Sequence, residues 1–358
     1  GFQVAVFESN EYPGGKLTDL SKEGYRFDMG PSLFTMPQFV EELFTVSKKN
    51  IKDYFSYKKK ETVCHYFYKD GTTFKALSDV NKFAMSAAKT FDVDEDELVN
   101  YFQKSKKKYE LTSSLFLEKS LHKLSTYFSK DTLTAVFNVN SLDINTTLHD
   151  YNADCFKDSR LVQLFDRYAT YNGSSPYQTP GIMSMIPHLE QYYGTFFPKG
   201  GMHSITQSIY KLAIDLGVEF NFNSKVDKIH VLDKKAIGIS TNTKDYFAEY
   251  VISNSDVVPT YRTLLKDQKS PEKTLQQPRS SSALIFYWGI KKEFPSLDLH
   301  NIFFSDNYKQ EFDYIFTKQE VYKDPTVYVN ISSKENKSDA PKGCENWFVM
   351  VNVPSNTG

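Results

Sequence analysis

Hydrophobic and polar positions follow three different patterns along the chain. Residues 1–60 contain short apolar strands separated by glycine turns, with a helical spacing over 37–47. Alternation on both sides of Asp70-Gly71, a pair that favours a type I′ turn, predicts a β-hairpin over 62–77. From 78 to about 191 the apolar residues recur at helical spacing, which predicts a helical insertion.

The rest of the chain returns to strands. A helix predicted over 202–216 is closed by Gly217, and the strand that follows over 218–222 is typical of parallel pairing. Shorter strands are expected over 226–229, 236–240 and 247–253, returning toward the first sheet. Alternating segments over 283–290, 301–304, 326–331 and 347–353 indicate a mostly antiparallel second sheet.

Composition narrows the class of protein. The 358 residues correspond to about two domains, and 40% hydrophobic with 24% charged residues is ordinary for a soluble globular protein. A net charge of −1, without a nucleic-acid-binding motif, argues against nucleic acid as a partner. Three scattered cysteines suit neither a disulfide framework nor a zinc site, and they favour the cytoplasm. No apolar stretch approaches the roughly 20 residues that span a bilayer, so we expect any membrane contact to be peripheral.

Two features of the composition leave alternatives open. The 29 Phe and 24 Tyr suit a long apolar tunnel, but composition alone favours a simple aromatic core. Basic residues over 104–108 lie beside the apolar stretch 111–121, a combination found on interfacial membrane helices. The same residues are also compatible with a solvated basic face.

Glu8 is the most informative single residue. It ends the apolar strand that starts at Val4 and is followed by Gly14 and Gly15. In dinucleotide-binding folds an acid at this position accepts hydrogen bonds from the adenosine ribose, and its charge would repel a 2′-phosphate. Glu8 therefore favours FAD or NAD over NADP.

The phosphate-binding partner of such an acid is not present in the sequence. A G-x-G-x-x-G motif normally lies about 20 residues upstream, whereas seven residues precede Glu8 here. Either Glu8 ends an ordinary strand, or the chain begins inside a nucleotide-binding unit. We expect the second, which implies an incomplete cofactor site.

Five segments in register resemble a known family. They are Val4–Lys16, Gly24–Ser32, Phe197–Gly201, Val251–Asp256 and Asp324–Ser332, and they resemble the bacterial phytoene desaturase type of FAD-dependent carotenoid desaturases, within the wider amine-oxidase-like flavoprotein group. Two further segments, 158–177 and 186–190, are more similar to the hydroxycarotenoid 3,4-desaturase branch. Monocyclic substrates similar to gamma-carotene are equally compatible.

The resemblance implies a cofactor-binding set. Glu8 would bind the adenosine ribose, and Val226 would contact the adenine through its backbone. The remaining residues are Gly14, Gly15 and Lys16 near the ribose and pyrophosphate, Gly30, Pro31 and Ser32 beside the isoalloxazine ring, and Asn254 toward the cofactor. Four of these residues have a simpler explanation: a plain turn for Gly14 and Gly15, a buried strand residue for Val226, and a turn former for Asn254.

The resemblance implies less about substrate and catalysis. Gly200 and Gly201 would lie along the flavin or substrate path, or else simply start a helix, and His188 would line that path or be a hydrogen-bonded core histidine. A flavin accepts a hydride while the polyene delocalises charge, so no acid–base pair is required. Asp143, Asp158 and Arg160 are the catalytic candidates, although lone charges of this kind usually lie on the surface. Seven histidines show no metal-binding spacing, and no metal is expected.

The expected fold class is α/β, with a Rossmann-like FAD/NAD(P)-binding domain, incomplete, formed by 1–60 and 195–265. A substrate domain takes 61–194 and 266–358, and it combines an antiparallel sheet with a helical insertion over 78–191 that would face the membrane or the solvent. The implied function is desaturation of a C40 carotenoid with FAD, in a cytoplasmic, peripherally membrane-associated enzyme that passes electrons to a quinone or oxygen. Alternatives are phytoene desaturase, retinol saturase, amine oxidase or a non-catalytic lipid carrier.

Overall fold

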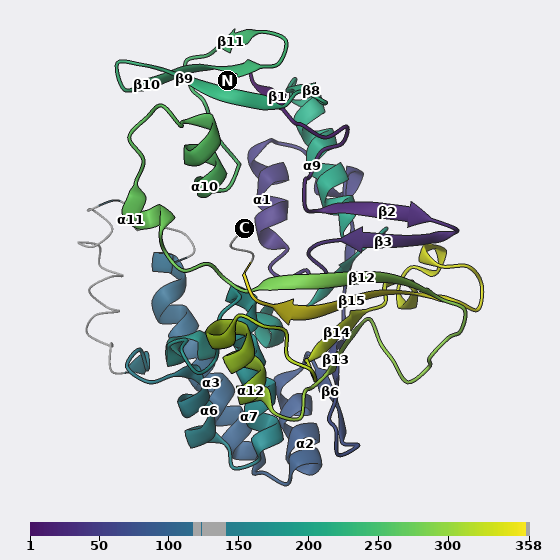
Figure 1. Ribbon diagram of the computed structural model, residues 1–358. Coiled ribbons are helices and arrows are strands. Elements are labelled where there is room, and N and C mark those ends of the chain that lie inside the picture. Colours follow the sequence, from purple (N-terminus) through teal and green to yellow (C-terminus); the bar gives the residue numbers. More distant parts are fainter. Residues whose placement is uncertain (117–122, 124–140, 356–358) are drawn as a thin grey trace.

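The computed structural model describes residues 1–116, 123 and 141–355. Figure 1 shows small sheets at one end of the molecule and, at the other, a group of helices beside a larger sheet. No helix in the described part of the chain is both long enough and apolar enough to cross a bilayer.

The first strand is held by a distant one. β1 (Ala5–Phe7) pairs in parallel with β8 (Glu219–Asn221), and α9 (His203–Asp215) leads into β8. Gly217 closes this helix in a left-handed conformation, with φ +83°, which glycine adopts without strain. The parallel strand predicted after Gly217 is therefore confirmed.

The next three strands form an antiparallel sheet of their own. β9 (Val226–Leu232) pairs with β10 (Lys235–Thr241), which pairs with β11 (Asp245–Phe247). The strand expected over 247–253 is wrong beyond Phe247. The pairing of β11 with β10 covers only three residues of each strand, from Ser240 opposite Asp245 to Gly238 opposite Phe247, with one more backbone hydrogen bond from Ala248 N to Ile237 O at 3.0 Å.

Smaller elements connect these sheets to the rest of the molecule. The helix expected over 37–47 is α1, and β4 lies antiparallel to β7, far from it in sequence. The bounds are β2 (Thr18–Lys22), β3 (Tyr25–Met29), α1 (Gln38–Val46), β4 (Tyr57–Lys59), β7 (Phe196–Pro198), α10 (Val257–Pro259) and α11 (Glu272–Leu275).

The large sheet has six strands in the order β12-β15-β14-β13-β5-β6. All neighbours are antiparallel except β13 and β5, which confirms the mostly antiparallel sheet expected for the end of the chain. The bounds are β5 (Thr62–Phe67), β6 (Thr73–Leu77), β12 (Ser282–Ile290), β13 (His300–Phe303), β14 (Val327–Asn330) and β15 (Glu345–Val353).

The hairpin of β5 and β6 is confirmed, but its turn is longer than the two-residue type I′ turn expected. Gly71 N donates to Tyr68 O, and Tyr68 N donates to Thr72 O. Only Gly71 has a positive φ, of +88°, because a type I turn followed by one left-handed residue makes the connection.

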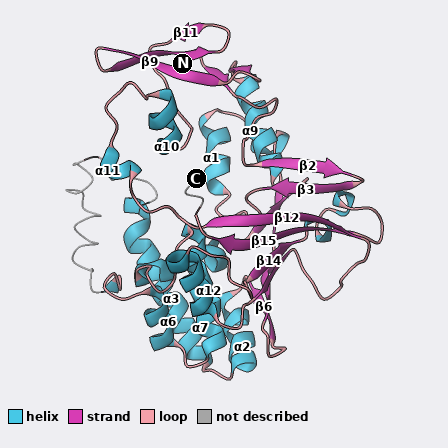
Figure 2. Cartoon of the chain, viewed as in Figure 1, coloured by secondary structure: helices cyan, strands magenta, loops and turns pink. Residues whose placement is uncertain are grey.

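The helical insertion is also confirmed and covers one face of the large sheet, as Figure 2 shows. The helices are α2 (Val80–Phe91), α3 (Glu95–Phe116), α6 (Leu148–Cys155) and α7 (Ser159–Asp166), joined by α12 (Tyr308–Asp313) from later in the chain. Short helical turns follow α7, including α8 (Ile186–His188) and the π-helix η5 (Leu189–Tyr193).

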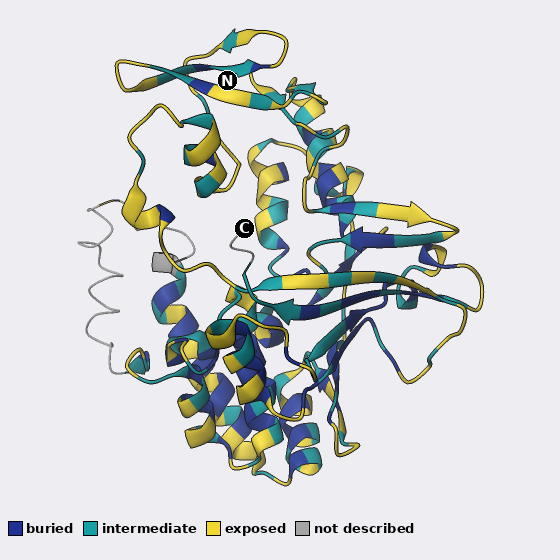
Figure 3. Ribbon diagram, in the orientation of Figure 1, coloured by how far each residue is buried: buried dark blue, intermediate teal, exposed yellow. Residues whose placement is uncertain are grey.

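The main core lies between these helices and the sheet. Figure 3 shows the buried residues on the facing sides of the two layers. Aromatic rings fill this space, with Tyr66, Phe74, Phe83 and Phe165 each almost fully buried. The aromatic composition therefore serves a packed core. The domain boundaries given above stay a prediction.

Candidate functional site

Glu8 lies directly after β1, where the ends of two parallel strands meet. Its backbone N–H donates to Asn221 O at 3.0 Å, and its carbonyl accepts from Ser224 N at 2.8 Å. One carboxylate oxygen accepts the N–H of Asn10 at 2.8 Å. Val226 begins β9, in the neighbouring sheet, two residues after the Ser224 that bonds to Glu8.

The glycine turns bring the other expected cofactor residues together. Gly30 has φ +98°, and an added Cβ would lie 2.2 Å from Lys16 O, so the two segments touch. At Gly14, with φ +101°, a Cβ would lie 2.5 Å from Thr206 Cγ2 on α9. Both positions require glycine because the chain is left-handed and crowded there.

The surface formed by these turns fits a flavin nucleotide. Gly15, Lys16 and Pro31 are exposed, and a Cβ added at Gly15 meets nothing within 4 Å. Backbone with no side chain over it is what close approach of a pyrophosphate needs, and Lys16 supplies a positive charge. Glu8, Gly14, Gly15, Lys16, Gly30 and Ser32 would hold the group. Asn254 is exposed in the segment before α10, and its role stays a prediction.

Gly201 packs against a charged pair at the start of α9. Arg26 Nη2 donates to Asp28 at 2.7 Å, and Asp28 accepts the backbone N–H groups of Met202 and His203, each at 2.9 Å. A Cβ on Gly201 would lie 2.5 Å from both Arg26 and Asp28. This contact explains the glycine. Whether Gly200 and Gly201 also line a substrate path stays a prediction.

Ser32 connects the glycine turns to the large sheet. Its hydroxyl lies 2.7 Å from Tyr328 OH on β14, and Tyr328 OH lies 2.7 Å from Nδ1 of His300 on β13. Desolvation by burial lowers the pKa of His300 to about 4. The ring is therefore neutral at physiological pH.

A buried ion pair lies between the sheet and the helices. Arg167 Nη2 donates to Glu190 at 2.9 Å, and Arg167 Nε donates to Tyr66 OH at 2.6 Å. Glu190 also accepts the hydroxyls of Tyr168, at 2.7 Å, and Tyr171. Burial opposes the charge on Arg167, but Glu190 and the tyrosines outweigh it and raise the pKa of Arg167.

His188 is surrounded by aromatic rings. Its ring lies 5.3 Å from that of Tyr109 and 4.8 Å from that of Tyr192, centroid to centroid. Burial lowers the pKa of His188 to about 4, so it is neutral. Among the described residues, no hydrogen bond or ring contact joins His188 to Gly200 or Gly201. Its place on a substrate path stays a prediction.

The three catalytic candidates each have a charged partner. Asp143 binds the ammonium group of the buried Lys108 at 2.7 Å. Asp158 caps α7 by accepting the N–H of Arg160 at 2.8 Å, and Arg160 also pairs with Asp70 in the hairpin turn. These contacts join elements of the substrate domain to one another. A part in catalysis stays a prediction for all three.

The basic segment over 104–108 divides into two kinds of residue. Lys104, Lys106 and Lys107 are exposed, whereas Lys108 is buried. Of the adjacent apolar stretch, residues 117–121 lie outside the described residues.

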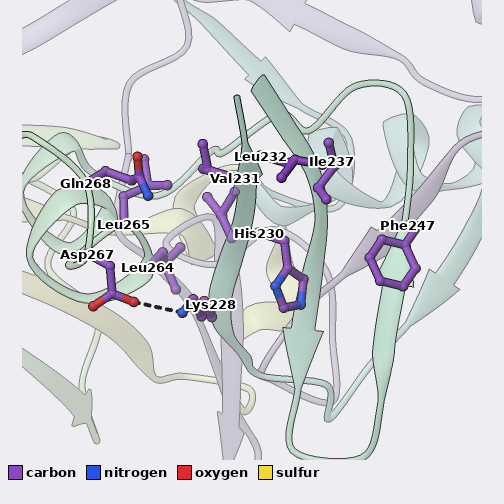
Figure 4. Close-up of a pocket in the computed structure, with 11 residues that line it drawn as sticks. Lys228, His230, Val231, Leu232, Ile237, Phe247, Leu264, Leu265, Asp267 and Gln268 are labelled. Atoms are coloured by element: carbon purple, nitrogen blue, oxygen red, sulfur yellow. Dashed lines mark hydrogen bonds and ion pairs between the residues drawn. The ribbon is translucent and has the colours of Figure 1, made fainter. Parts of the chain in front are cut away.

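Two further hollows contain none of the expected site residues. One, of about 220 Å³, lies between β9, β10 and the segment 264–268, and Figure 4 shows its apolar walls and the ion pair between Lys228 and Asp267 at 2.7 Å. The other, of about 520 Å³, is lined by His149, Asp166 and residues of α7 and α12. No group of three potential metal ligands occurs in the described ranges.

Sequence reasoning missed the polar groups that tertiary structure buries. Arg167 and Glu190 lie in the two segments that carry the subfamily resemblance, but nothing in their spacing predicts that they pair. Tyr328 lies in the strand expected over 326–331, and His300 directly precedes the strand expected over 301–304. The signal that could have revealed these residues is a polar side chain at a strand position where alternation predicts an apolar, core-facing one.

Comparison with known proteins places the chain in a class. Residues 1–292 match the family described as flavin containing amine oxidoreductase. The chain belongs to this family of flavin-dependent oxidoreductases.

Individual relatives show which members of this family the chain is similar to. The chain is 57% identical over 358 residues to 1-hydroxycarotenoid 3,4-desaturase of Flavobacterium sp. (strain P99-3), covering all of this chain and 73% of that protein. It is 31% identical to 4,4'-diapolycopene oxygenase of Methylomonas sp., over 99% of this chain and 71% of that one. A solved oxidoreductase from Methanosarcina mazei has a similar fold, with a TM-score of 0.62 and 15% identity over 99% of this chain and 74% of that chain.

These findings confirm the family resemblance, the oxidoreductase class, the FAD cofactor and the α/β flavoprotein fold.

Proposed function

We propose that this protein is a FAD-dependent carotenoid desaturase that introduces C=C bonds into a C40 polyene, and specifically a hydroxycarotenoid 3,4-desaturase. The observation that carries the proposal is the 57% identity to 1-hydroxycarotenoid 3,4-desaturase over the whole chain. The similarity to 4,4'-diapolycopene oxygenase is 31%, which favours desaturation over oxygenation.

The chain's own residues supply binding, orientation and charge. FAD, when bound, supplies the two-electron oxidation that takes a hydride from the carbon next to a conjugated chain. Glu8 offers a carboxylate to the ribose diol, and Lys16 a positive charge to the pyrophosphate. The glycines at 14, 15 and 30 allow close backbone approach. The Ser32 hydroxyl lies 2.7 Å from the hydroxyl of Tyr328 on β14, a central strand of the large sheet.

The partners proposed with this function are a membrane surface and an electron acceptor, either a quinone or oxygen. A C40 polyene is insoluble in water and resides in lipid. The absence of a spanning helix from the described residues is compatible with peripheral association. The exposed side chains of Phe39, Leu43 and Val46 on α1, followed by Lys48 and Lys49, have the composition of an interfacial helix.

Anaerobic flavin reduction tests the proposal. The protein is loaded with FAD and mixed with liposomes that contain a 1-hydroxylated acyclic carotene, and flavin absorbance and the carotenoid spectrum are followed together. We expect flavin bleaching with lengthening of the polyene. Reduction by amines without reduction by carotenoids would contradict the proposal and favour an amine oxidase.

Matched substrates separate the remaining alternatives. Phytoene and retinol in the same liposomes distinguish phytoene desaturase and retinol saturase activity, and we expect slower flavin reduction with both. Carotenoid binding by a protein that shows no flavin absorbance after loading would favour a lipid carrier instead.

A further inference from the structure

A row of polar side chains joins Ser32 to the large sheet. The hydroxyl of Ser32, the hydroxyl of Tyr328 and Nδ1 of His300 follow one another at 2.7 Å each. Tyr328 and His300 lie on neighbouring strands, β14 and β13, and His300 is 3% exposed. The row leads from the turn proposed to face the flavin ring into the interior of the sheet.

The neighbouring amide determines which nitrogen of His300 carries the proton. Asn330 Nδ2 lies 3.2 Å from Leu299 O, which can only accept, so this atom must be the amide nitrogen. The same nitrogen lies 3.2 Å from Nδ1 of His300 and can only donate to it. Nδ1 is therefore an acceptor without a proton, and the neutral ring carries its proton on Nε2.

This tautomer sets the direction of both other hydrogen bonds. Nδ1 without a proton has one lone pair: Tyr328 donates to it at 2.7 Å, and the more distant amide of Asn330, at 3.2 Å, makes the weaker contact. The oxygen of Tyr328 is then available as an acceptor, and Ser32 must donate to it. The proton of the Ser32 hydroxyl is committed to Tyr328, which leaves its lone pairs as the group that Ser32 can offer to a ligand.

We propose that Ser32 is a hydrogen-bond acceptor for an N–H of the flavin ring, and that Tyr328 and His300 are the positioning residues that impose this polarity. The inference rests on the proposed flavin site. The isoalloxazine ring has one N–H donor when oxidised, at N3, and a further one at N5 when reduced. Each of these N–H groups would donate to Ser32 in the same way, and FAD affinities in the oxidised and reduced states separate them.

A proton relay is the competing explanation, and two features count against it. His300 Nε2 is buried and has no hydrogen-bond partner among the residues that the structure describes, so the row ends there. The pKa of His300, about 4, makes the ring a poor proton acceptor at neutral pH. A positioning role needs neither a continuation of the row nor a change of charge.

FAD titration of the full chain tests the inference. Ser32→Ala removes the acceptor, and Tyr328→Phe frees the Ser32 hydroxyl to rotate. We expect each to weaken FAD binding roughly tenfold, since one hydrogen bond contributes about 0.5–1.5 kcal/mol and tenfold corresponds to about 1.4 kcal/mol. In the double variant, Tyr328→Phe should add almost nothing, because the group it orients is absent.

A control and a second readout keep the test independent of activity. Tyr322→Phe removes a hydroxyl that donates to Gln310 at 2.8 Å, and it should leave FAD binding unchanged. Nitrogen NMR of labelled histidine should show His300 with a bare Nδ1 and a protonated Nε2. A proton on Nδ1, or additive losses in the double variant, would overturn the inference.

The flavin nitrogen is identified by comparing oxidised with reduced FAD. Equal losses of affinity indicate N3, and a loss confined to the reduced form, seen as a lower reduction potential, indicates N5. If the unaltered protein binds no FAD, the proposed function fails as well. If it binds FAD and the two single variants bind equally well, only the inference about Ser32 fails.

Discussion

Two regions of this protein place their polar groups in opposite ways, one in exposed backbone turns and the other in buried, paired side chains. The turns from Glu8 to Ser32 are partly exposed and depend on backbone conformation, with glycines that no other residue replaces without strain. The interior of the large sheet is closed and depends on paired side chains, such as Arg167 and Glu190. The first region is easily recognised in a sequence, and the second emerges only when distant strands and helices meet.

The largest effect is expected from breaking the buried ion pair. Glu190→Ala leaves Arg167 and the hydroxyls of Tyr168 and Tyr171 without their acceptor, and removing one partner of a buried pair costs about 3–5 kcal/mol. Urea denaturation measures the loss. In the double variant Arg167→Met/Glu190→Leu the loss should be smaller, since no charge is left unpaired. A single variant within about 1 kcal/mol of the unaltered protein would contradict this account.

Acid sensitivity should come next in size. The folded pKa of His300, about 4, lies below the usual 6.5, so the unfolded chain binds more protons between these values. Stability from His300 is therefore complete above pH 6.5 and lost as the pH falls toward 4, by roughly 3 kcal/mol. Unfolding free energies of His300→Gln across this window should vary less with pH.

His149 provides a control, because its pKa is shifted in the opposite direction to that of His300. The hydrogen bond that His149 donates to the Asp166 carboxylate raises the pKa of His149, so its contribution is complete below pH 6.5 and lost as the pH rises through the folded pKa. His149→Gln should therefore leave the acid-side loss in place. An equal flattening by both variants would show that the burial of His300 is not the cause.

The turn region should respond to backbone strain. Gly30→Ala introduces a Cβ at φ +98°, 2.2 Å from Lys16 O, and we expect a loss of about 1–3 kcal/mol together with weaker FAD binding. Gly71→Ala, at φ +88° with nothing within 4 Å, is the matched control and should lose stability without changing FAD affinity. Thermal unfolding and FAD titration measure the two effects separately.

The smallest effect is expected at the candidate Asp158. Asp158→Ala removes the cap of α7 and should cost about 1 kcal/mol. If the cap is its whole role, Asp158→Asn should restore stability and leave the rate of flavin reduction unchanged. A large fall in that rate, with stability intact in Asp158→Asn, would instead support the catalytic prediction.

Local patterns explain which expectations succeeded. The hairpin around Gly71, the helix closed by Gly217 and the alternating strands at the end of the chain depend on neighbours in sequence, and the structure confirms them. The strand expected beyond Phe247 is wrong because the end of a strand depends on its partner, and the pairing of β11 with β10 ends at Phe247 opposite Gly238.

Periodicity, turn residues and the family resemblance by themselves determined the elements, the fold class and the flavin. Only the tertiary structure decided that Arg167 meets Glu190, that Asp28 holds the start of α9, and that Tyr328 lies between Ser32 and His300. The physical reason is that backbone conformation follows from adjacent residues. The burial of a polar group, its partner and its proton are set by chain segments up to hundreds of residues away.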